Sequence, residues 1–176
     1  MFCDVSLLAY CAAFYVQSTD ESGQVSSELL FCINRIVPLK GHSNSNLELS
    51  IPKLELSAAK LASEKLHSVL DNIQFENVFA FTDSITVLCW LSKPPGLSKT
   101  FVRNRVRSII QVLPFEMWQY VRTAANPADL GTHGIAAVDL NKSSLWCDGP
   151  AFLRESNWLN QNVLSNADLE TALARC

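Results

Sequence analysis

The order of the apolar segments is the feature that most limits how this chain can fold. Three strand-like segments come first, joined by short polar stretches, and they lie at Phe2 to Val5, Tyr10 to Gln17 and Leu29 to Leu39. Consecutive strands with short connections pair antiparallel, whereas strands separated by helices are typically parallel. Helical and strand-like patterns alternate in the rest of the chain, so the order predicts a mixed sheet with helices on both faces.

The later elements follow from the spacing of apolar residues and from helix-start signals. Ser50-Ile51-Pro52 opens a helix whose apolar residues recur at helical spacing as far as Leu70. Short apolar runs predict two more strands, at Asn77 to Thr82 and at Met117 to Val121. The remaining helices are expected at Ser84 to Leu91, at Phe101 to Leu113 and from Asn126-Pro127 onward. The predicted order is β β β α β α α β α, without an internal repeat.

Length and composition favour one domain with a C-terminal extension. The chain has 176 residues, of which 48% are hydrophobic and 18% are charged, which suits a buried core and excludes a disordered, highly charged protein. We expect a core domain over residues 1–140 and, over residues 141–160, an appendage that docks its aromatic side chains on the core. Residues 161–176 are expected to form a polar tail, with a possible short helix from Leu164 to Leu173.

Cysteine usage and the lack of long apolar runs predict an intracellular protein without a membrane partner. No apolar run approaches the roughly 20 residues that a membrane span needs, and no basic region of a signal peptide precedes the first one. None of the six cysteines forms a CxxC pair, so we expect buried, reduced thiols. The three histidines are scattered, which argues against a zinc site.

Four acidic residues stand at informative places in the expected elements. Asp4 lies in the first strand, Glu55 in the first turn of the first long helix, Asp83 directly after a strand, and Asp129 in the first turn of the last helix. Sites in α/β sheets form at the carboxyl ends of strands, so Asp83 fits directly and the others would converge on it. Each also has a structural explanation, as a helix cap, a partner of a helix dipole or a turn residue.

Converging carboxylates favour metal-dependent chemistry. They cannot all stay ionised without a counter-charge, and Mg²⁺ prefers oxygen ligands. Two such ions about 4 Å apart activate a water molecule and stabilise the leaving oxygen in phosphodiester cleavage. The acidic set therefore suits a nuclease.

Basic residues gather in one segment of this otherwise acidic chain. The chain has a net charge of −3, but residues 93–122 hold six basic residues and one acidic residue, a net charge of +5. Arg103 and Arg107 are four residues apart and share a helix face. With Lys99 they could contact a phosphate backbone, and the alternative is a solvated helix face.

Six strings occur in series along the chain: FCDVSLLAY, SIPKLELSAA, FTDSITVLCWL, TFVRNRV, NPADLGTHG and SSLWCDGPAFLRE. In this order they resemble the ribonuclease H-like region of BEL/Pao-type LTR retrotransposon polyproteins, a family often filed under the name Pao retrotransposon peptidase. The resemblance covers Met1 to Trp158, and its most specific part is the series FTDS, NPADL and SLWxxGPxxL.

The resemblance implies a ribonuclease H-like α/β fold with a five-stranded mixed sheet in the order 3-2-1-4-5. It also implies a set of metal ligands for two Mg²⁺ or Mn²⁺ ions, at Asp4, Glu55, Asp83 and Asp129. The implied activity is hydrolysis of the RNA strand of RNA–DNA hybrids during reverse transcription. The implied partners are the hybrid and the reverse transcriptase and integrase regions of the same polyprotein, in a cytoplasmic virus-like particle or the nucleus.

The chain departs from the family pattern at several positions. Val5 replaces the usual alanine, and Cys11 replaces the glycine that usually follows the tyrosine, so we expect Cys11 to crowd a turn. The arginine of the ADLxSRG string is absent after Asp129. The sequence begins three residues before Asp4, so we expect a short first strand and a fragment of a polyprotein.

Three alternatives to an active ribonuclease H stay open. One is a catalytically inactive relic or connector domain with weak nucleic-acid binding. Another is an aspartic peptidase, but that chemistry needs paired aspartates in D-[ST]-G turns, and the nearest strings are Asp83-Ser84-Ile85 and Asp4-Val5-Ser6. The last is an unrelated α/β domain for a small ligand, although the sequence contains no glycine-rich phosphate loop.

Overall fold

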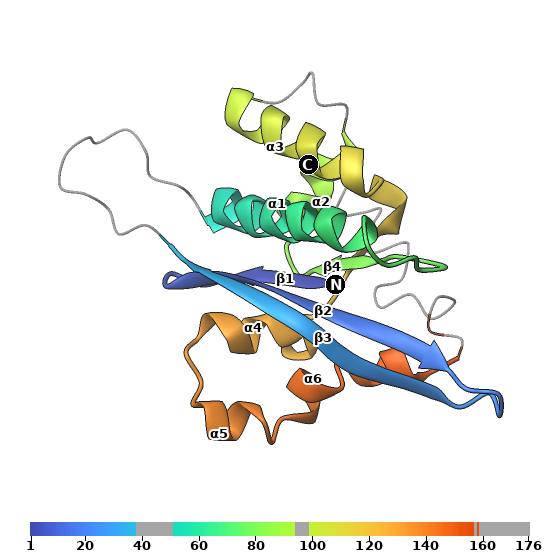
Figure 1. Ribbon diagram of the computed structural model, residues 1–176. Helices are drawn as coiled ribbons and strands as arrows, with labels where there is room; N and C mark the ends of the chain where they lie inside the picture. Colours follow the sequence, from blue (N-terminus) through green and yellow to red (C-terminus); the bar gives the residue numbers. More distant parts are fainter. Residues whose placement is uncertain (38–50, 94–98, 157, 159–176) are drawn as a thin grey trace.

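A five-stranded mixed sheet in the order β3-β2-β1-β4-β5 forms the centre of the computed structural model, which describes residues 1–37, 51–93, 99–156 and 158 (Figure 1). The strands are β1 (Phe2–Val5), β2 (Ala9–Thr19), β3 (Val25–Ile36), β4 (Ala80–Thr82) and β5 (Trp118–Tyr120). β1 pairs antiparallel with β2 and parallel with β4, and β5 adds a parallel edge. The predicted fold class and strand order are confirmed.

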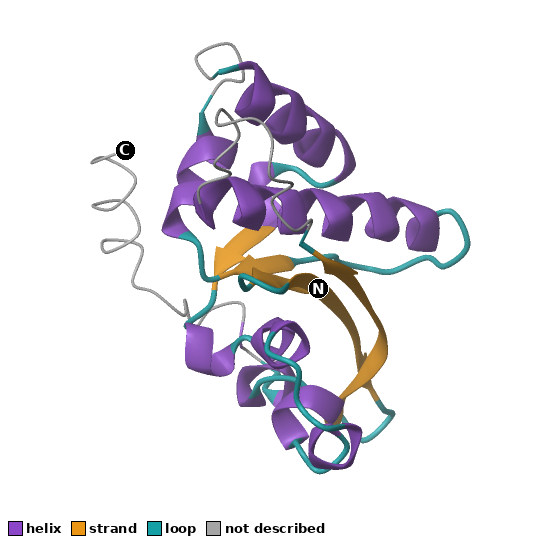
Figure 2. Ribbon diagram, turned by 90° about the vertical axis from the view of Figure 1, so that its left-hand side faces the viewer, coloured by secondary structure: helices purple, strands orange, loops and turns teal. Residues whose placement is uncertain are grey.

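Helices cover both faces of this sheet (Figures 1 and 2). On one face lie α1 (Ile51–Leu70), α2 (Ile85–Ser92) and α3 (Thr100–Val112). On the other face lie α4 (Pro127–Thr132), α5 (Ala137–Leu140) and α6 (Ser144–Cys147). The start of α4 follows the prediction, because Asn126 Oδ1 accepts a hydrogen bond from Ala128 N and Pro127 takes the first helical position.

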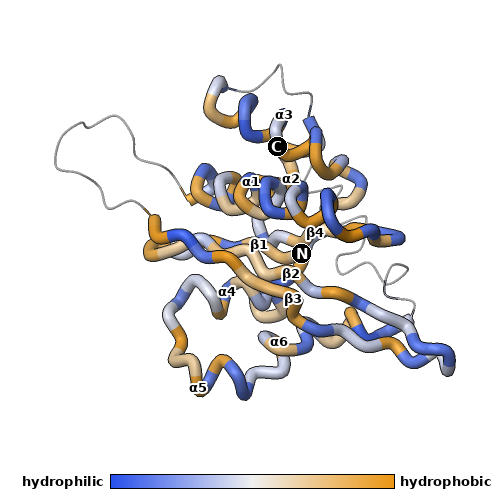
Figure 3. The backbone as a smooth tube through the Cα atoms, viewed as in Figure 1, coloured by the Kyte–Doolittle hydropathy of each residue, from blue (hydrophilic) through white to orange (hydrophobic). Residues whose placement is uncertain are grey.

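Each face of the sheet has its own apolar core, because successive residues of a strand point to opposite sides. Phe2 of β1 packs toward α4, where its ring stacks on Phe81 of β4 with centroids 4.7 Å apart. Cys3 points to the other face, into the core beneath α1 and α3. In Figure 3 hydrophobic and hydrophilic stretches alternate along α1 and α3, as expected for helices with one buried side.

Several strand boundaries differ from the prediction, most clearly at the turn between β2 and β3 and at the start of β4. The turn between β2 and β3 is shorter than expected, because Asp20 Oδ1 accepts hydrogen bonds from Ser22 N and Gln24 N and closes a tight turn with Gly23 at a φ of 85°. This turn is hydrophilic throughout (Figure 3). β4 begins at Ala80 rather than Asn77, and Ala80 pairs with Trp118, the first residue of β5. The expected loop at 41–46 and the tail from 161 lie outside the described residues.

Aromatic residues near the C-terminus pack on the face that carries α4. The rings of Phe152 and Trp158 lie 5.4 and 5.7 Å from the ring of Phe81. The Tyr15 hydroxyl on β2 donates to the carbonyl oxygen of Trp146 at 2.6 Å. These contacts attach Trp146, Phe152 and Trp158 to the sheet.

The expectation for the cysteines holds only in part. Cys3 and Cys11 are buried free thiols, but Cys32 on β3 is an exposed free thiol, so the prediction of burial is wrong there. Among the described residues, no helix is both long and apolar enough to cross a membrane.

Candidate active site

Asp4 and Asp83 lie at neighbouring strand ends. Asp4 is the third residue of β1, and Asp83 directly follows β4. β1 and β4 are adjacent and parallel, with Cys3 opposite Thr82, so their carboxyl ends meet at one edge of the sheet. Burial raises the pKa of Asp4 to about 7, and the negative charge of Asp83 adds to this rise.

Glu55 approaches the same edge from α1. The helix begins at Ile51, so Glu55 lies in its second turn, and the expectation of a first-turn position is wrong. Burial raises the pKa of Glu55, a hydrogen bond from Ser84 acts against this rise, and the charge of Asp83 adds to it. Glu55 and Asp4 therefore both respond to the charge of Asp83.

Asp129 lies in the first turn of α4, as expected. Its carboxylate Oδ1 is 3.3 Å from His133 Nδ1, and its charge makes a small contribution to the raised pKa of Asp4. A hydrogen bond to the Asp129 carbonyl oxygen and the Asp129 carboxylate raise the pKa of His133. α4 packs against β1 and β2, and this packing carries Asp129 toward Asp4.

Three of the four carboxylates accept hydrogen bonds from hydroxyl groups on other elements. Ser84 Oγ donates to Glu55 Oε2 at 2.5 Å, and Thr123 Oγ1 donates to Asp83 Oδ2 at 2.7 Å. Thr132 Oγ1 lies 3.1 Å from Asp4 Oδ2. The sequence analysis missed Thr123 and Thr132 as site residues, because these contacts join residues 40 and 128 positions apart and leave no local signal.

The chemistry of this donor set fits a hard divalent cation. All four side chains offer carboxylate oxygens, the ligands that Mg²⁺ prefers. In the described part of the chain, no lysine, arginine or histidine pairs with Asp4, Glu55 or Asp83, so their charges lack a cationic partner. The same residues contain no group of three or more His, Cys, Asp or Glu side chains placed to hold a metal ion. Each hydroxyl group contacts one carboxylate oxygen: Glu55 Oε2, Asp83 Oδ2 or Asp4 Oδ2.

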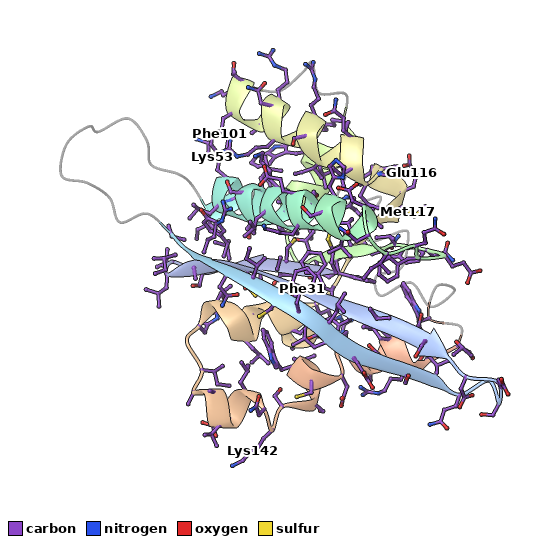
Figure 4. All side chains as sticks on the ribbon, viewed as in Figure 1. Phe31, Lys53, Phe101, Glu116, Met117 and Lys142 are labelled. Atoms are coloured by element: carbon purple, nitrogen blue, oxygen red, sulfur yellow. The ribbon has the colours of Figure 1, made fainter. Side chains whose placement is uncertain are left out.

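The basic residues at and on α3 differ in their environment: some face solvent, and one packs against α1. Lys99 and Arg107 are exposed, and Arg103 is half-buried, with its guanidinium 3.3 Å from Thr100 Oγ1. Arg105 instead turns toward α1, where it donates to Ser57 Oγ and lies 3.5 Å from the centre of the Phe101 ring. Lys53 of α1 lies beside the same ring (Figure 4).

Cys11 does not crowd a turn, so that expectation is wrong. It lies within β2, opposite Asp4, and is fully buried. A Cβ atom added to Gly131 of α4 would lie 2.5 Å from Cys11 Sγ. The glycine at position 131 therefore provides the space that the thiol occupies.

The mixed sheet in the order β3-β2-β1-β4-β5, with helices on both faces, has the arrangement of an RNase H-like α/β fold. The family model of the Pao retrotransposon-like RNaseH-like domain matches residues 1–84, so the resemblance is confirmed for that part of the chain. The match spans β1 to β4, ends directly before α2, and includes Asp4, Glu55 and Asp83. No curated protein and no solved structure matches the chain. Asp129 and the basic helix lie beyond the matched residues.

Proposed function

We propose that this chain is a retrotransposon ribonuclease H domain that hydrolyses the RNA strand of RNA–DNA hybrids with Mg²⁺ or Mn²⁺. The observation that carries the proposal is the meeting of Asp4 and Asp83 at the ends of two parallel strands. Burial and the charge of Asp83 raise the pKa of Asp4 to about 7, as expected for carboxylates that lack a counter-ion. Both residues lie within the part that matches the family.

Asp4, Glu55, Asp83 and Asp129 would hold the metal ions. Bound metal supplies positive charge that activates water and stabilises the leaving oxygen. The chain itself contributes oxygen ligands on four different elements: β1, α1, the β4–α2 junction and α4. The Ser84, Thr123 and Thr132 hydroxyls orient three of these carboxylates.

Lys99, Arg103 and Arg107 would bind the phosphate backbone of the hybrid. Lys99 directly precedes α3 and Arg107 lies within it, and both residues are exposed. α3 lies on the same side of the sheet as α1, which carries Glu55. Recognition of a hybrid depends on the shape of the duplex and its 2′-hydroxyls, which suits charged contacts without base readout. Arg105 is excluded from this role, because it packs between α1 and α3.

Cleavage of a labelled RNA–DNA hybrid with Mg²⁺ or Mn²⁺ tests the proposal. Wild-type protein should cut the RNA strand, and Asp83→Asn should lose the activity while remaining folded. Asp71→Asn is the matched control, because Asp71 is exposed, follows the last residue of α1 and pairs only with His67 among the described residues. Equal cleavage by Asp83→Asn and wild type would contradict the role of Asp83.

A non-catalytic connector domain is the second candidate. It is supported by the placement of the acidic side chains, because the described residues contain no group of three or more His, Cys, Asp or Glu placed to hold a metal ion. A folded wild-type protein that neither cleaves the hybrid nor binds Mn²⁺ would favour this candidate.

A further inference from the structure

Thr132 joins the strand that carries Asp4 to the helix that carries Asp129. It is the last residue of α4, and only 2% of its surface is exposed. Its Oγ1 lies 3.1 Å from Asp4 Oδ2 and 2.9 Å from the carbonyl oxygen of Asp129. The carbonyl oxygen of Thr132 accepts a hydrogen bond from Ser6 Oγ at 2.8 Å, which secures the same junction just beyond β1.

The partners of the Thr132 hydroxyl compete for a single proton. A hydroxyl group offers one donor and two acceptor positions. Asp4 Oδ2 and the Asp129 carbonyl oxygen are both acceptors, and His133 Nδ1 lies 3.1 Å from the same hydroxyl. If His133 Nδ1 is protonated and donates to Thr132 Oγ1, the threonine hydroxyl still donates its own proton to one acceptor, either Asp4 Oδ2 or the Asp129 carbonyl oxygen. The hydroxyl therefore couples the Asp4 carboxylate to the turn that holds Asp129.

A local role alone does not explain this arrangement. Threonine hydroxyls often bond a backbone carbonyl three or four residues earlier in a helix, and the contact with Asp129 O is of this kind. The contact with Asp4 spans 128 positions and reaches the carboxylate of a buried residue, of which 8% of the surface is exposed. An apolar residue of the same shape would fill the space equally well but would leave that carboxylate oxygen without its donor.

We propose that Thr132 is a positioning residue, whose hydroxyl orients the Asp4 carboxylate relative to Asp129 for binding of a shared divalent cation. This inference rests on the proposed function, because it assumes that the two carboxylates bind metal. Groups that orient metal ligands typically change metal affinity by about 10- to 100-fold when they are removed.

The test compares two substitutions that separate the hydroxyl from the shape of the side chain. Thr132→Val keeps the shape and removes the hydroxyl, whereas Thr132→Ser keeps the hydroxyl and removes the methyl group. Mn²⁺ binding is measured by titration calorimetry, and kcat and KM are measured on a labelled hybrid. We expect Thr132→Val to bind Mn²⁺ at least about 10-fold more weakly and to lower kcat with little change in KM for the hybrid. Thr132→Ser should stay within about twofold of wild type, on the same reasoning.

Thr132→Ala against Thr132→Ser provides the same comparison if the valine variant does not fold, because these two differ only in the hydroxyl. The inference would be overturned if Thr132→Val bound Mn²⁺ as tightly as wild type while Thr132→Ser bound it more weakly, because affinity would then depend on packing and not on the hydroxyl group. Equal affinity in the alanine and serine variants would also overturn it. Folded wild-type protein that neither binds Mn²⁺ nor cleaves the hybrid would instead refute the proposed function, and the inference would fall with it.

Discussion

Ser84 Oγ donates a hydrogen bond to Glu55 Oε2 at a distance of 2.5 Å and so joins the start of α2 to the second turn of α1. Ser84 Oγ also accepts a hydrogen bond from Val87 N and so caps α2. Ser84 directly follows Asp83, so one side chain both starts the helix and holds Glu55 next to Asp83. Structure and candidate chemistry therefore depend on the same hydroxyl group.

Ser84→Ala should lower the free energy of unfolding by about 1–2 kcal/mol, because it removes both the helix cap and a bond to a half-buried carboxylate. Urea unfolding followed by circular dichroism measures the loss. Ser68→Ala is the control, since Ser68 is exposed on α1 and, among the described residues, its hydroxyl bonds only the carbonyl oxygen of Glu64. Equal losses in the two variants would show that the bond to Glu55 contributes nothing.

Asp4 should stabilise the metal-free protein at low pH, and this contribution should be lost as the pH rises from about 4 to about 7. Asp4→Asn should remove this contribution. Burial and then Asp83 raise the pKa of Asp4 from 3.8 to about 7 in the folded state. The folded state thus retains a proton that the unfolded state has lost, and this stabilising contribution disappears as the pH rises through the folded-state value.

Chemical unfolding in the presence of a chelator, repeated at pH 4, 5.5, 7 and 8, measures this dependence for wild type, Asp4→Asn and Asp71→Asn. The Asp71→Asn curve should run parallel to that of wild type, since Asp71 is exposed near the end of α1. Parallel curves for Asp4→Asn and wild type would contradict the raised pKa of Asp4.

Tyr15→Phe should cost about 1 kcal/mol of stability, because it removes the hydrogen bond that attaches residues 145–146 to β2. Thermal unfolding followed by tryptophan fluorescence measures the effect, since Trp146 and Trp158 lie in the same apolar cluster. Tyr10→Phe on the same strand is the control, because its hydroxyl bonds no described residue. If both variants match wild type, the Tyr15 hydrogen bond is not needed for docking of this region.

Arg103→Gln and Arg107→Gln should each weaken hybrid binding and each reduce the slope of log affinity against log salt by about 1, as expected for loss of one phosphate contact. Fluorescence anisotropy at several salt concentrations measures both quantities. Lys142→Gln is the control, because Lys142 lies across the sheet from α3 (Figure 4). A similar change of slope in the Lys142→Gln protein would indicate binding without a defined surface.

Much of the fold could be predicted from the sequence. The bounds of β1, the start of α1 and the cap of α4 follow from strand alternation, helical spacing and the Asn126-Pro127 pair, all of which are local. The position of Asp83 after a buried strand also indicated the edge at which a site would form. The strand order came from the family resemblance, because local patterns predict a mixed sheet but not the order of its strands.

Only the tertiary structure decided how the site residues are surrounded. Thr123 and Thr132 reach Asp83 and Asp4 from distant parts of the chain, and Gly131 provides the space for Cys11. No local pattern encodes such contacts, since they depend on how residues 123–132, which include α4, pack against the strands of the sheet. The sequence by itself determined which elements form and which acidic residues they carry. The packing of those elements determined the burial, and therefore the raised pKa, of Asp4, because both solvation and charge repulsion depend on distances between separate elements.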